Sequence, residues 1–426
     1  MYKKLTSALF LLSIGVAVFA QGRVGSPYTR YGIGDITRST LTRNNSMGGL
    51  SYTLPYANGI NYANPAAVGE IDSLTFILDF GINGGARLFQ ISDPEYSQVK
   101  SDFHLSHINF GFAVTKWWKA AAGVLPFSDV GYSISSKDTL LNVDKNYLFA
   151  GDGGINKVFF TNAFNPFNNL YFGITASYLF GKIYQSNGIV FNDETGAFLN
   201  VFEQNTIQIH DFSVDAGLKY VYKINDVNSL SIGAVYGLNS NLGAVRTRII
   251  YHTLSSSSAV VDTVFRADDE DGIISLPQNI GLGLGYQYND KLYLGFDYTM
   301  QSWANAEFFG QTDNLSNSKF MSLGVEYIPS GSRGSIFSYW KGVAYRGGVH
   351  YNQNYFKLAS GETPINDFGI SFGLGLPMKR SKTSFNISLE YGQRGTLDNS
   401  LVKENYAILG ISFNLAETWF VKSKFD

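Results

Sequence analysis

The chain has 426 residues, of which 45% are hydrophobic and only 15% charged, and its formal net charge is -2. Globular proteins carry about 25% charged residues, so this composition argues against an ordinary cytosolic surface. The absence of cysteine excludes disulfides, thiolate metal sites and cysteine nucleophiles, and the small net charge excludes the basic surface typical of nucleic-acid binding.

Residues 1–20 have the composition of a leader. Lys3 and Lys4 precede an apolar run from Leu9 to Phe19, and Ala20 follows the run. This order predicts a secretory signal peptide that is cleaved before Gln21. A membrane anchor is the alternative, but the run is shorter than the about 20 residues that a spanning helix needs. We therefore expect the mature chain outside the cytoplasm, and the lack of cysteine after the cleavage site excludes a lipoprotein.

Residues 21–72 do not have the pattern of long strands, because glycine and proline interrupt them too often. They carry apolar and aromatic side chains, among them Tyr28 and Tyr31, and several arginines, among them Arg30. A disordered periplasmic extension would have fewer apolar residues. We therefore predict that residues 21–72 form a plug inside the domain that follows.

Residues 73–426 alternate with a period of two, as Phe172, Ile174 and Ala176 do against Gly173 and Thr175. This alternation predicts strands with one apolar and one small or polar face. We expect fourteen of them, although uncertain boundaries leave twelve or sixteen open. The expected ranges are 73–82, 102–114, 118–127, 153–163, 170–183, 207–222, 229–247, 278–288, 291–304, 318–328, 342–351, 367–377, 383–392 and 405–416.

Two architectures fit such strands. In a soluble sandwich the apolar faces turn inward, whereas in an outer-membrane barrel they turn outward to lipid. The segments are longer than the 5–6 residues typical of soluble strands. Aromatic pairs such as Trp117-Trp118 and Trp419-Phe420 lie at segment ends, where membrane barrels carry their aromatic girdles. The pattern favours an all-β, transmembrane, up-and-down antiparallel β-barrel.

The gaps between the expected strands alternate between long and short, as expected for outer loops and periplasmic turns. The range 329–341 is an exception, because it is longer than a turn should be. The long gaps, which we expect to be polar loops, are 83–101, 128–152, 184–206, 248–277, 305–317, 352–366 and 393–404.

Several motifs resemble those of a known family. Asn64-Pro65-Ala66 follows a glycine-rich stretch directly before the first expected strand, Leu276-Pro277-Gln278 precedes Gly281-Leu282-Gly283, and Arg346-Gly347-Gly348-Val349 precedes a late strand. These segments resemble the outer-membrane long-chain fatty acid transporters (FadL/TodX type). The opening Ser26-Pro27-Tyr28 is similar to the Bacteroidetes branch. The resemblance implies fourteen strands, an N-terminal hatch, and uptake of hydrophobic molecules that leave sideways through the wall. It departs from the family at Lys424-Phe425-Asp426, where a terminal aromatic residue is common.

No motif predicts catalysis, so we expect neither an enzyme nor a cofactor. His104 and His107 are three residues apart, which in a regular strand places them on opposite faces and argues against a shared metal. The run Asp268, Asp269, Glu270 and Asp271 offers oxygen ligands for Ca²⁺. The alternative interpretation, a solvated loop tip, is commoner for such a run.

The sequence thus divides into a signal peptide (1–20), a plug or hatch (21–72) and a transmembrane barrel (73–426) in the outer membrane of a Gram-negative bacterium. The leading hypothesis is passive uptake of small hydrophobic molecules such as long-chain fatty acids. The alternatives are a non-transporting barrel subunit of an outer-membrane secretion or assembly complex, with an apolar patch in 248–277 for its protein partners, and a polar-solute porin. The expected ligand-binding residues are Tyr28, Arg30, Tyr31, Asn64, Pro65 and Ala66.

Overall fold

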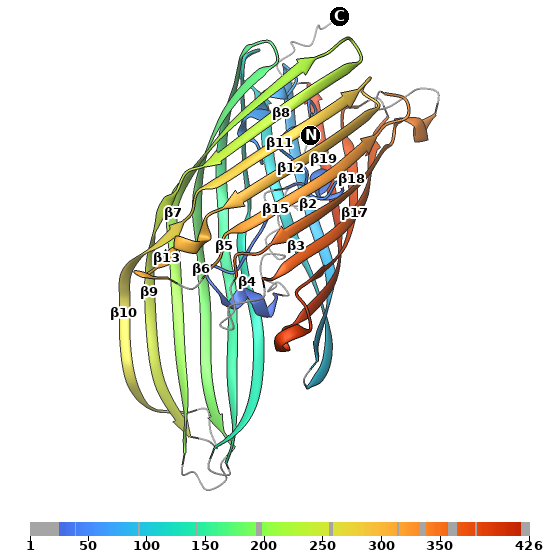
Figure 1. Ribbon diagram of the computed structural model, residues 1–426. Helices are drawn as coiled ribbons and strands as arrows, with labels where there is room; N and C mark the ends of the chain where they lie inside the picture. The colour runs from blue at the N-terminus through green and yellow to red at the C-terminus, as the bar shows by residue number, and fades with distance from the viewer. Residues whose placement is uncertain are drawn as a thin grey trace, which may run out of the picture.

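The computed structural model describes residues 25–38, 40–92, 94–140, 143–192, 198–254, 259–312, 315–331, 338–356, 364–379 and 381–418. The expected signal peptide and the pair Trp419-Phe420 therefore lie outside the described residues. The described strands form one antiparallel sheet that closes on itself, because β2 (Thr75–Ser92) pairs with both β3 (Glu95–Ala113) and β19 (Lys403–Thr418). Figure 1 shows this barrel with one side of its wall drawn out well beyond the other. The predicted antiparallel barrel is confirmed.

The wall has fourteen strands, as predicted. Two of them are interrupted. β8 and β9 both pair with β7, and they are separated at Leu238 and Asn239. β10 pairs with β9 and β11 pairs with β8, with the break at Pro277 and Gln278. The other wall strands are β4 (Trp118–Leu140), β5 (Val143–Phe167), β6 (Leu170–Phe191), β7 (Leu199–Lys223), β8 (Asn228–Gly237), β9 (Ser240–Leu254), β10 (Val260–Leu276), β11 (Asn279–Tyr288), β12 (Leu292–Gln301), β15 (Ser318–Tyr327), β16 (Ala344–Gln353), β17 (Asn366–Pro377) and β18 (Ser384–Arg394).

The remaining elements are short. Among the described residues, three strands have two residues each: β1 (Asp35–Ile36), β13 (Glu307–Phe308) and β14 (Gln311–Thr312). The helical turns are η1 (Pro27–Arg30), α2 (Thr42–Asn45), η2 (Pro65–Glu70), η3 (Trp303–Asn305), η4 (Tyr339–Gly342) and η5 (Asp398–Ser400). The turn η4 occupies part of the unexpectedly long range 329–341. None of the described helices is long and apolar enough to span a membrane.

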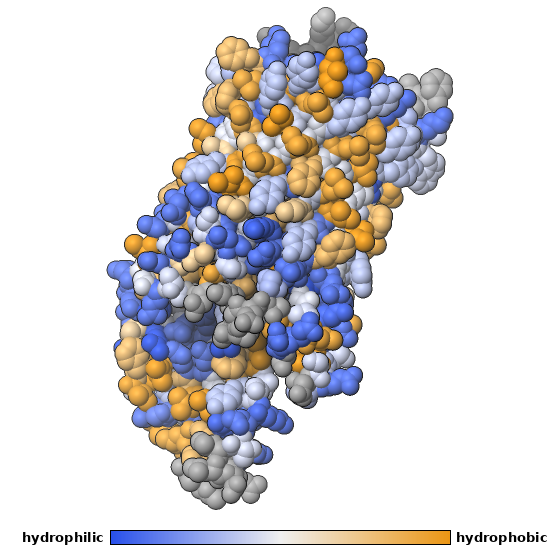
Figure 2. All heavy atoms as spheres, in the orientation of Figure 1, coloured by the Kyte–Doolittle hydropathy of each residue, from blue (hydrophilic) through white to orange (hydrophobic). Residues whose placement is uncertain are grey.

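The apolar faces of the strands point outward. On β6, Ile174 is 55% exposed while its neighbour Thr175 is buried, and on β11 Leu284 is 58% exposed between two buried glycines. Figure 2 shows hydrophobic side chains over the barrel end that carries β8 and β11, and more hydrophilic side chains lower on the visible face. An apolar outer face and a polar interior are the arrangement of a membrane barrel and not of a soluble one.

Four of the gaps expected to be polar loops are largely strand instead, so this part of the prediction was wrong. The ranges 83–101, 128–152, 184–206 and 248–277 extend the hairpins β2–β3, β4–β5, β6–β7 and β9–β10. The physical reason is that backbone pairing continues between hairpin partners beyond the lipid, where the outer face no longer has to be apolar. Periodicity of hydrophobicity therefore ends before the strand does.

The N-terminal region lies inside the barrel, as predicted. Figure 1 shows the first described residues, in blue, folded within the ring of strands. Its contacts explain the glycines on the inner face of the wall. A Cβ added to Gly173 would lie 2.2 Å from the carbonyl carbon of Pro65, and one added to Gly348 would lie 2.2 Å from that of Met47. The wall carries no side chain at these points because the backbone of the N-terminal region packs directly on it. We call this region, residues 25–72, the hatch.

Candidate functional site

The wall has a seam between β3 and β4. The two strands form six pairs, from Ile108 with Val124 to Ala113 with Lys119. Beyond this point β3 continues to pair with β2, and β4 continues to pair with β5. Pro126 lies just past the last pair. Proline lacks the N–H that a ladder needs and is confined to strand edges. The local sequence therefore ends the pairing of β3 with β4 within the described residues.

The hatch occupies the free edge of β4 at the seam. β1 pairs antiparallel with β4 through Ile36 and Ser128, and the Thr37 N–H donates a hydrogen bond of 2.9 Å to the Phe127 carbonyl. The Gly131 N–H donates to Oγ1 of Thr29 at 3.1 Å. The hatch therefore supplies part of the backbone pairing that β3 does not.

Two cavities lie between the hatch and the wall. The first, of about 210 Å³, is lined by hatch residues, by Lys157 and by parts of β7, β8 and β12 that include Asp215 and Asp297. The second, of about 200 Å³, lies beside the seam and is lined by hatch residues, by residues of β2, β3 and β4, and by residues of β16 to β19. Ile36, Thr37, Arg38 and Thr40 line both cavities. Tyr62, Asn352 and Asn354 also line both cavities, so this short hatch segment forms part of the partition between the two chambers.

Buried charges fasten the hatch to the wall. The Glu326 carboxylate accepts hydrogen bonds from hatch Arg43, at 2.8 and 3.1 Å, and from wall Arg346, at 2.7 Å. On another part of the wall, Lys219 pairs with hatch Glu70 at 2.7 Å. Buried ions need such partners, and removal of one partner leaves an uncompensated charge.

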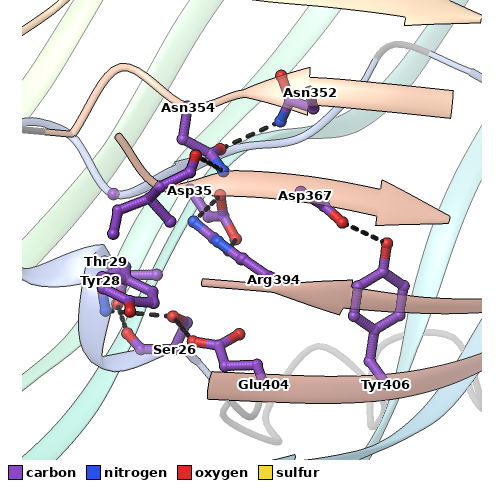
Figure 3. Close-up of polar contacts among 12 residues, drawn as sticks. Ser26, Tyr28, Thr29, Asp35, Asn352, Asn354, Asp367, Arg394, Glu404 and Tyr406 are labelled. Carbon is purple, nitrogen blue, oxygen red and sulfur yellow. Dashed lines mark hydrogen bonds and ion pairs between the residues drawn. The ribbon is translucent and has the colours of Figure 1, made fainter. Parts of the chain in front are cut away.

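Figure 3 shows a second set of anchors, where the start of the hatch lies over β18 and β19. Arg394 of β18 donates to both carboxylate oxygens of Asp35, at 2.6 and 3.1 Å. The Ser26 hydroxyl donates to buried Glu404 of β19. The partition residue Arg38 donates to Glu390 at 3.2 Å, and its guanidinium lies 5.1 Å from the centre of the Phe320 ring.

The six residues predicted to bind ligand do not line either cavity. The Tyr28 hydroxyl donates to the Val402 carbonyl at 2.6 Å, and burial raises the pKa of Tyr28 above its ordinary value, so the hydroxyl remains a donor. The Arg30 guanidinium lies 3.9 Å from the centre of the Phe149 ring, and Tyr31 packs near Phe356.

Asn64, Pro65 and Ala66 begin η2. The Asn64 side chain accepts from the Ala66 N–H at 3.0 Å and donates to the Tyr52 and Leu218 carbonyls at 2.8 and 3.2 Å. Asn64 thus caps the turn and ties it to β7. Ligand binding by these six residues stays a prediction.

The cavity-lining charges were missed by the sequence reasoning. Lys157, Asp215 and Asp297 each interrupt an apolar strand on its inner face. The signal that could have identified these residues is a charged side chain at an inward position of an otherwise apolar or glycine-rich strand. Such a charge needs a polar or charged partner inside the barrel.

The prediction that His104 and His107 point to opposite faces was wrong. The register of β3 on β2 shifts beside Ser106, where Gly81 pairs with His107 and Ile82 with Leu105. A bulge adds one residue and so turns both histidines inward. His107 nevertheless contacts Asp79 at 2.9 Å, and His104 contacts Asp102 at 3.1 Å. In the described part of the chain, no group of three or more metal-ligand side chains comes together.

The acidic run lies on β10, not at a loop tip. Arg266 pairs with Asp268, and Arg246 pairs with Glu270, both at 2.7 Å. Two of the four carboxylates are therefore matched by arginine. The structure gives no coordination arrangement to the run, and its Ca²⁺ binding stays a prediction.

Comparisons with known proteins agree with this architecture. A model of the family described as BamG matches residues 1–426, and no curated protein matches the chain. Among solved structures, a Pseudomonas aeruginosa FadL homologue has 13% identity and a TM-score of 0.57, and covers 91% of this chain and 100% of its own. The Pseudomonas putida toluene transporter TodX has 14% identity and a TM-score of 0.56, with the same coverage. The Ralstonia pickettii toluene transporter TbuX has 16% identity and a TM-score of 0.54, and covers 89% of this chain and 98% of its own.

At these identities the likeness concerns the fold, which is that of the FadL/TodX-type barrels, as the sequence motifs indicated. The closed barrel and its apolar outer surface locate the chain in the outer membrane of a Gram-negative bacterium. The match over its whole length shows that the chain belongs to the BamG family.

Proposed function

We propose that this chain is an outer-membrane barrel for passive uptake of small hydrophobic molecules. The observation that carries the proposal is the seam between β3 and β4, where a cavity lined by hatch and wall adjoins the described parts of β3 and β4 that do not pair with each other. A solute that enters from outside would reach the membrane sideways through the seam, after movement of the hatch segment at Ile36 to Thr40.

The size of the cavities favours small solutes over long acyl chains. Each cavity holds about 200 Å³, whereas pockets for drug-sized ligands hold about 300–1,000 Å³. The similar TodX and TbuX structures are described as toluene transporters. We therefore propose single-ring aromatic compounds or similarly small apolar molecules as the substrate class.

Proteoliposomes test this proposal. Vesicles that contain the full chain should accumulate ¹⁴C-toluene faster than vesicles that contain an unrelated closed barrel, and dodecanoic acid should enter more slowly than toluene. Equal rates for vesicles with and without the chain would contradict uptake. Faster entry of dodecanoic acid would keep uptake and contradict the small-solute class.

A second candidate function, a non-transporting subunit of an outer-membrane complex, is favoured by one specific observation. The hatch is held by buried ion pairs at Glu326, Lys219 and Arg394, and both cavities are lined by charged groups. A barrel that only supports partners needs no moving hatch. Purification in mild detergent distinguishes the two: other proteins in fixed stoichiometry would support the subunit role.

A further inference from the structure

A row of polar side chains crosses the inner face of the wall beside the first cavity. Figure 1 shows β8, β11, β12 and β15 side by side, and β7 pairs with β8. Successive register partners on β7, β8, β11, β12 and β15 are Asp215, Gly237, Asn279, Gln301 and Ser318. Direct partners in an antiparallel sheet share a face, and all five residues line the first cavity. The row therefore forms a polar side of that cavity.

Asp215 is a member of this row that the protein leaves unmatched. Its half-buried carboxylate has neither a hydrogen bond nor an ion pair within the described part of the chain. Gly237 gives it room, because a Cβ at Gly237 would lie 2.7 Å from Asp215 Oδ1. A carboxylate that is withdrawn from bulk water needs a hydrogen-bond donor. The cavity is therefore suited to a ligand that donates a hydrogen bond to Asp215.

The two interruptions of the wall give the same cavity an apolar side. Leu238 lies in the break between β8 and β9, while Leu276 and Pro277 lie at the break between β10 and β11. All three residues line the first cavity. Apolar walls with a few polar groups that orient the ligand are typical of sites for small molecules. The ligand that fits this lining has an apolar body and one polar end.

The balance of charge in the cavity favours a neutral ligand. Among the described residues, its lining contains two acids, Asp215 and Asp297, and two bases, Lys157 and Arg38. The Asp297 carboxylate accepts hydrogen bonds from two hatch N–H groups, at 2.6 and 2.9 Å, and Arg38 donates to Glu390. A hydroxyl group can donate to Asp215 and accept from the Lys157 ammonium, which an ammonium ligand cannot do. The polar end of the ligand is therefore better a hydroxyl than an ammonium group.

We propose that the first cavity binds single-ring aromatic compounds that carry a hydroxyl group. The hydroxyl donates to the Asp215 carboxylate, and the ring lies against Leu238, Leu276 and Pro277. The inference rests on the proposed uptake function and narrows its substrate class from toluene-like to phenol-like compounds. It makes Asp215 a residue that determines specificity, and it gives the breaks in the wall a role in binding.

The pair p-cresol and toluene tests the proposal, because p-cresol is toluene with one added hydroxyl. Equilibrium dialysis measures the binding of each ¹⁴C-labelled compound to the purified full chain, with protein-free micelles of the same detergent as the blank. The native barrel should bind p-cresol about tenfold more tightly than toluene, as expected for a hydrogen bond to a charged group. Asp215→Ala should bring this ratio close to one. The ratio cancels any effect of the enlarged cavity, and retained binding of toluene shows that the variant is folded.

Asp226→Ala is the matched control, since it removes an exposed acid in the turn after β7 and should keep the native ratio. Equal affinity of the native barrel for the two compounds would overturn the proposal, because water alone would then satisfy Asp215. An unchanged ratio in Asp215→Ala would also overturn it, as would tighter binding of the cation 4-methylbenzylamine than of p-cresol.

The failure of this inference and that of the proposed function give different results. If the hydroxyl has no effect on binding, toluene can still enter proteoliposomes, and only the narrower substrate class is lost. If p-cresol binding depends on Asp215 but neither compound enters the vesicles faster than without the chain, uptake is contradicted and the binding site remains.

Discussion

Gly217 of β7 faces hatch residue Asn64 so closely that a Cβ on Gly217 would lie 2.3 Å from Asn64 Oδ1. Asn64 at the same time caps η2 and donates to the neighbouring Leu218 carbonyl. A larger residue at position 217 would therefore overlap Asn64 and displace Asn64-Pro65-Ala66 from their observed position.

We predict that Gly217→Val displaces η2 and lowers the unfolding temperature of the purified barrel by several degrees. The added side chain would overlap the Asn64 amide, which caps η2 and is packed against the wall. Gly347→Ala is the matched control, since its nearest contacts would be ordinary ones at 3.9 Å. Faster trypsin cleavage of the hatch should accompany the Gly217 variant. Equal cleavage of both variants would show that η2 does not depend on this contact.

Glu326→Gln should weaken the attachment of the hatch to the wall more than a substitution at an exposed position does. The carboxylate is shared by two buried arginines, and loss of one partner of a buried ion pair costs about 3–5 kcal/mol. Urea titration followed by tryptophan fluorescence measures the loss. Glu307→Gln, at an exposed position, is the control. An effect of Glu326→Gln no larger than that of the control would mean that Arg43 and Arg346 find other partners.

A disulfide between β1 and β4 should stop solute movement through the seam. Ile36 and Ser128 are register partners, and the chain has no cysteine of its own, so Ile36→Cys with Ser128→Cys creates a single pair. Oxidation should abolish toluene entry into proteoliposomes and reduction should restore it. The pair Ser133→Cys with Ala150→Cys, register partners on β4 and β5, should have no effect. Unchanged entry through the oxidised Ile36–Ser128 variant would rule out this route.

Arg38→Ala should join the two cavities. The Arg38 side chain lines both of them and is fixed by Glu390, so its removal should open a passage between them. The expected result is a higher single-channel conductance in planar bilayers than that of the unchanged barrel. Lys319→Ala, at an exposed position on β15, is the control. Equal conductance of the Arg38 variant and the control would mean that other side chains form the partition.

The sequence predicted the barrel because lipid imposes a strict alternation on every strand that crosses it, as Phe172 to Ile174 and Leu282 to Leu284 illustrate. It did not predict that hairpins such as β4–β5 extend beyond the lipid, where Asp138, Lys145 and Asp152 can face water and the alternation disappears. The glycines on the inner face leave room for hatch backbone against the wall, as the contact of Gly173 with Pro65 shows.

The cavity residues could not be predicted in the same way. Lys157 and Asp215 lie on different strands, and only closure of the barrel brings them to one chamber. The inward turn of His104 and His107 depends on a bulge at Ser106 that leaves no trace in the period of the sequence. The aromatic and arginine residues of the hatch were recognised as a group, but the sequence did not reveal that Tyr28 and Arg30 pack against protein.

Mass spectrometry of the organic extract of the native protein, purified in mild detergent, tests the central claim most directly. Uptake through the seam predicts that small apolar compounds co-purify at about one molecule per barrel. It also predicts that they are absent from the variant with cysteines at positions 36 and 128 when its disulfide is formed before the cells meet the compounds. An extract without such compounds, from a barrel that carries other proteins in fixed ratio, would contradict uptake.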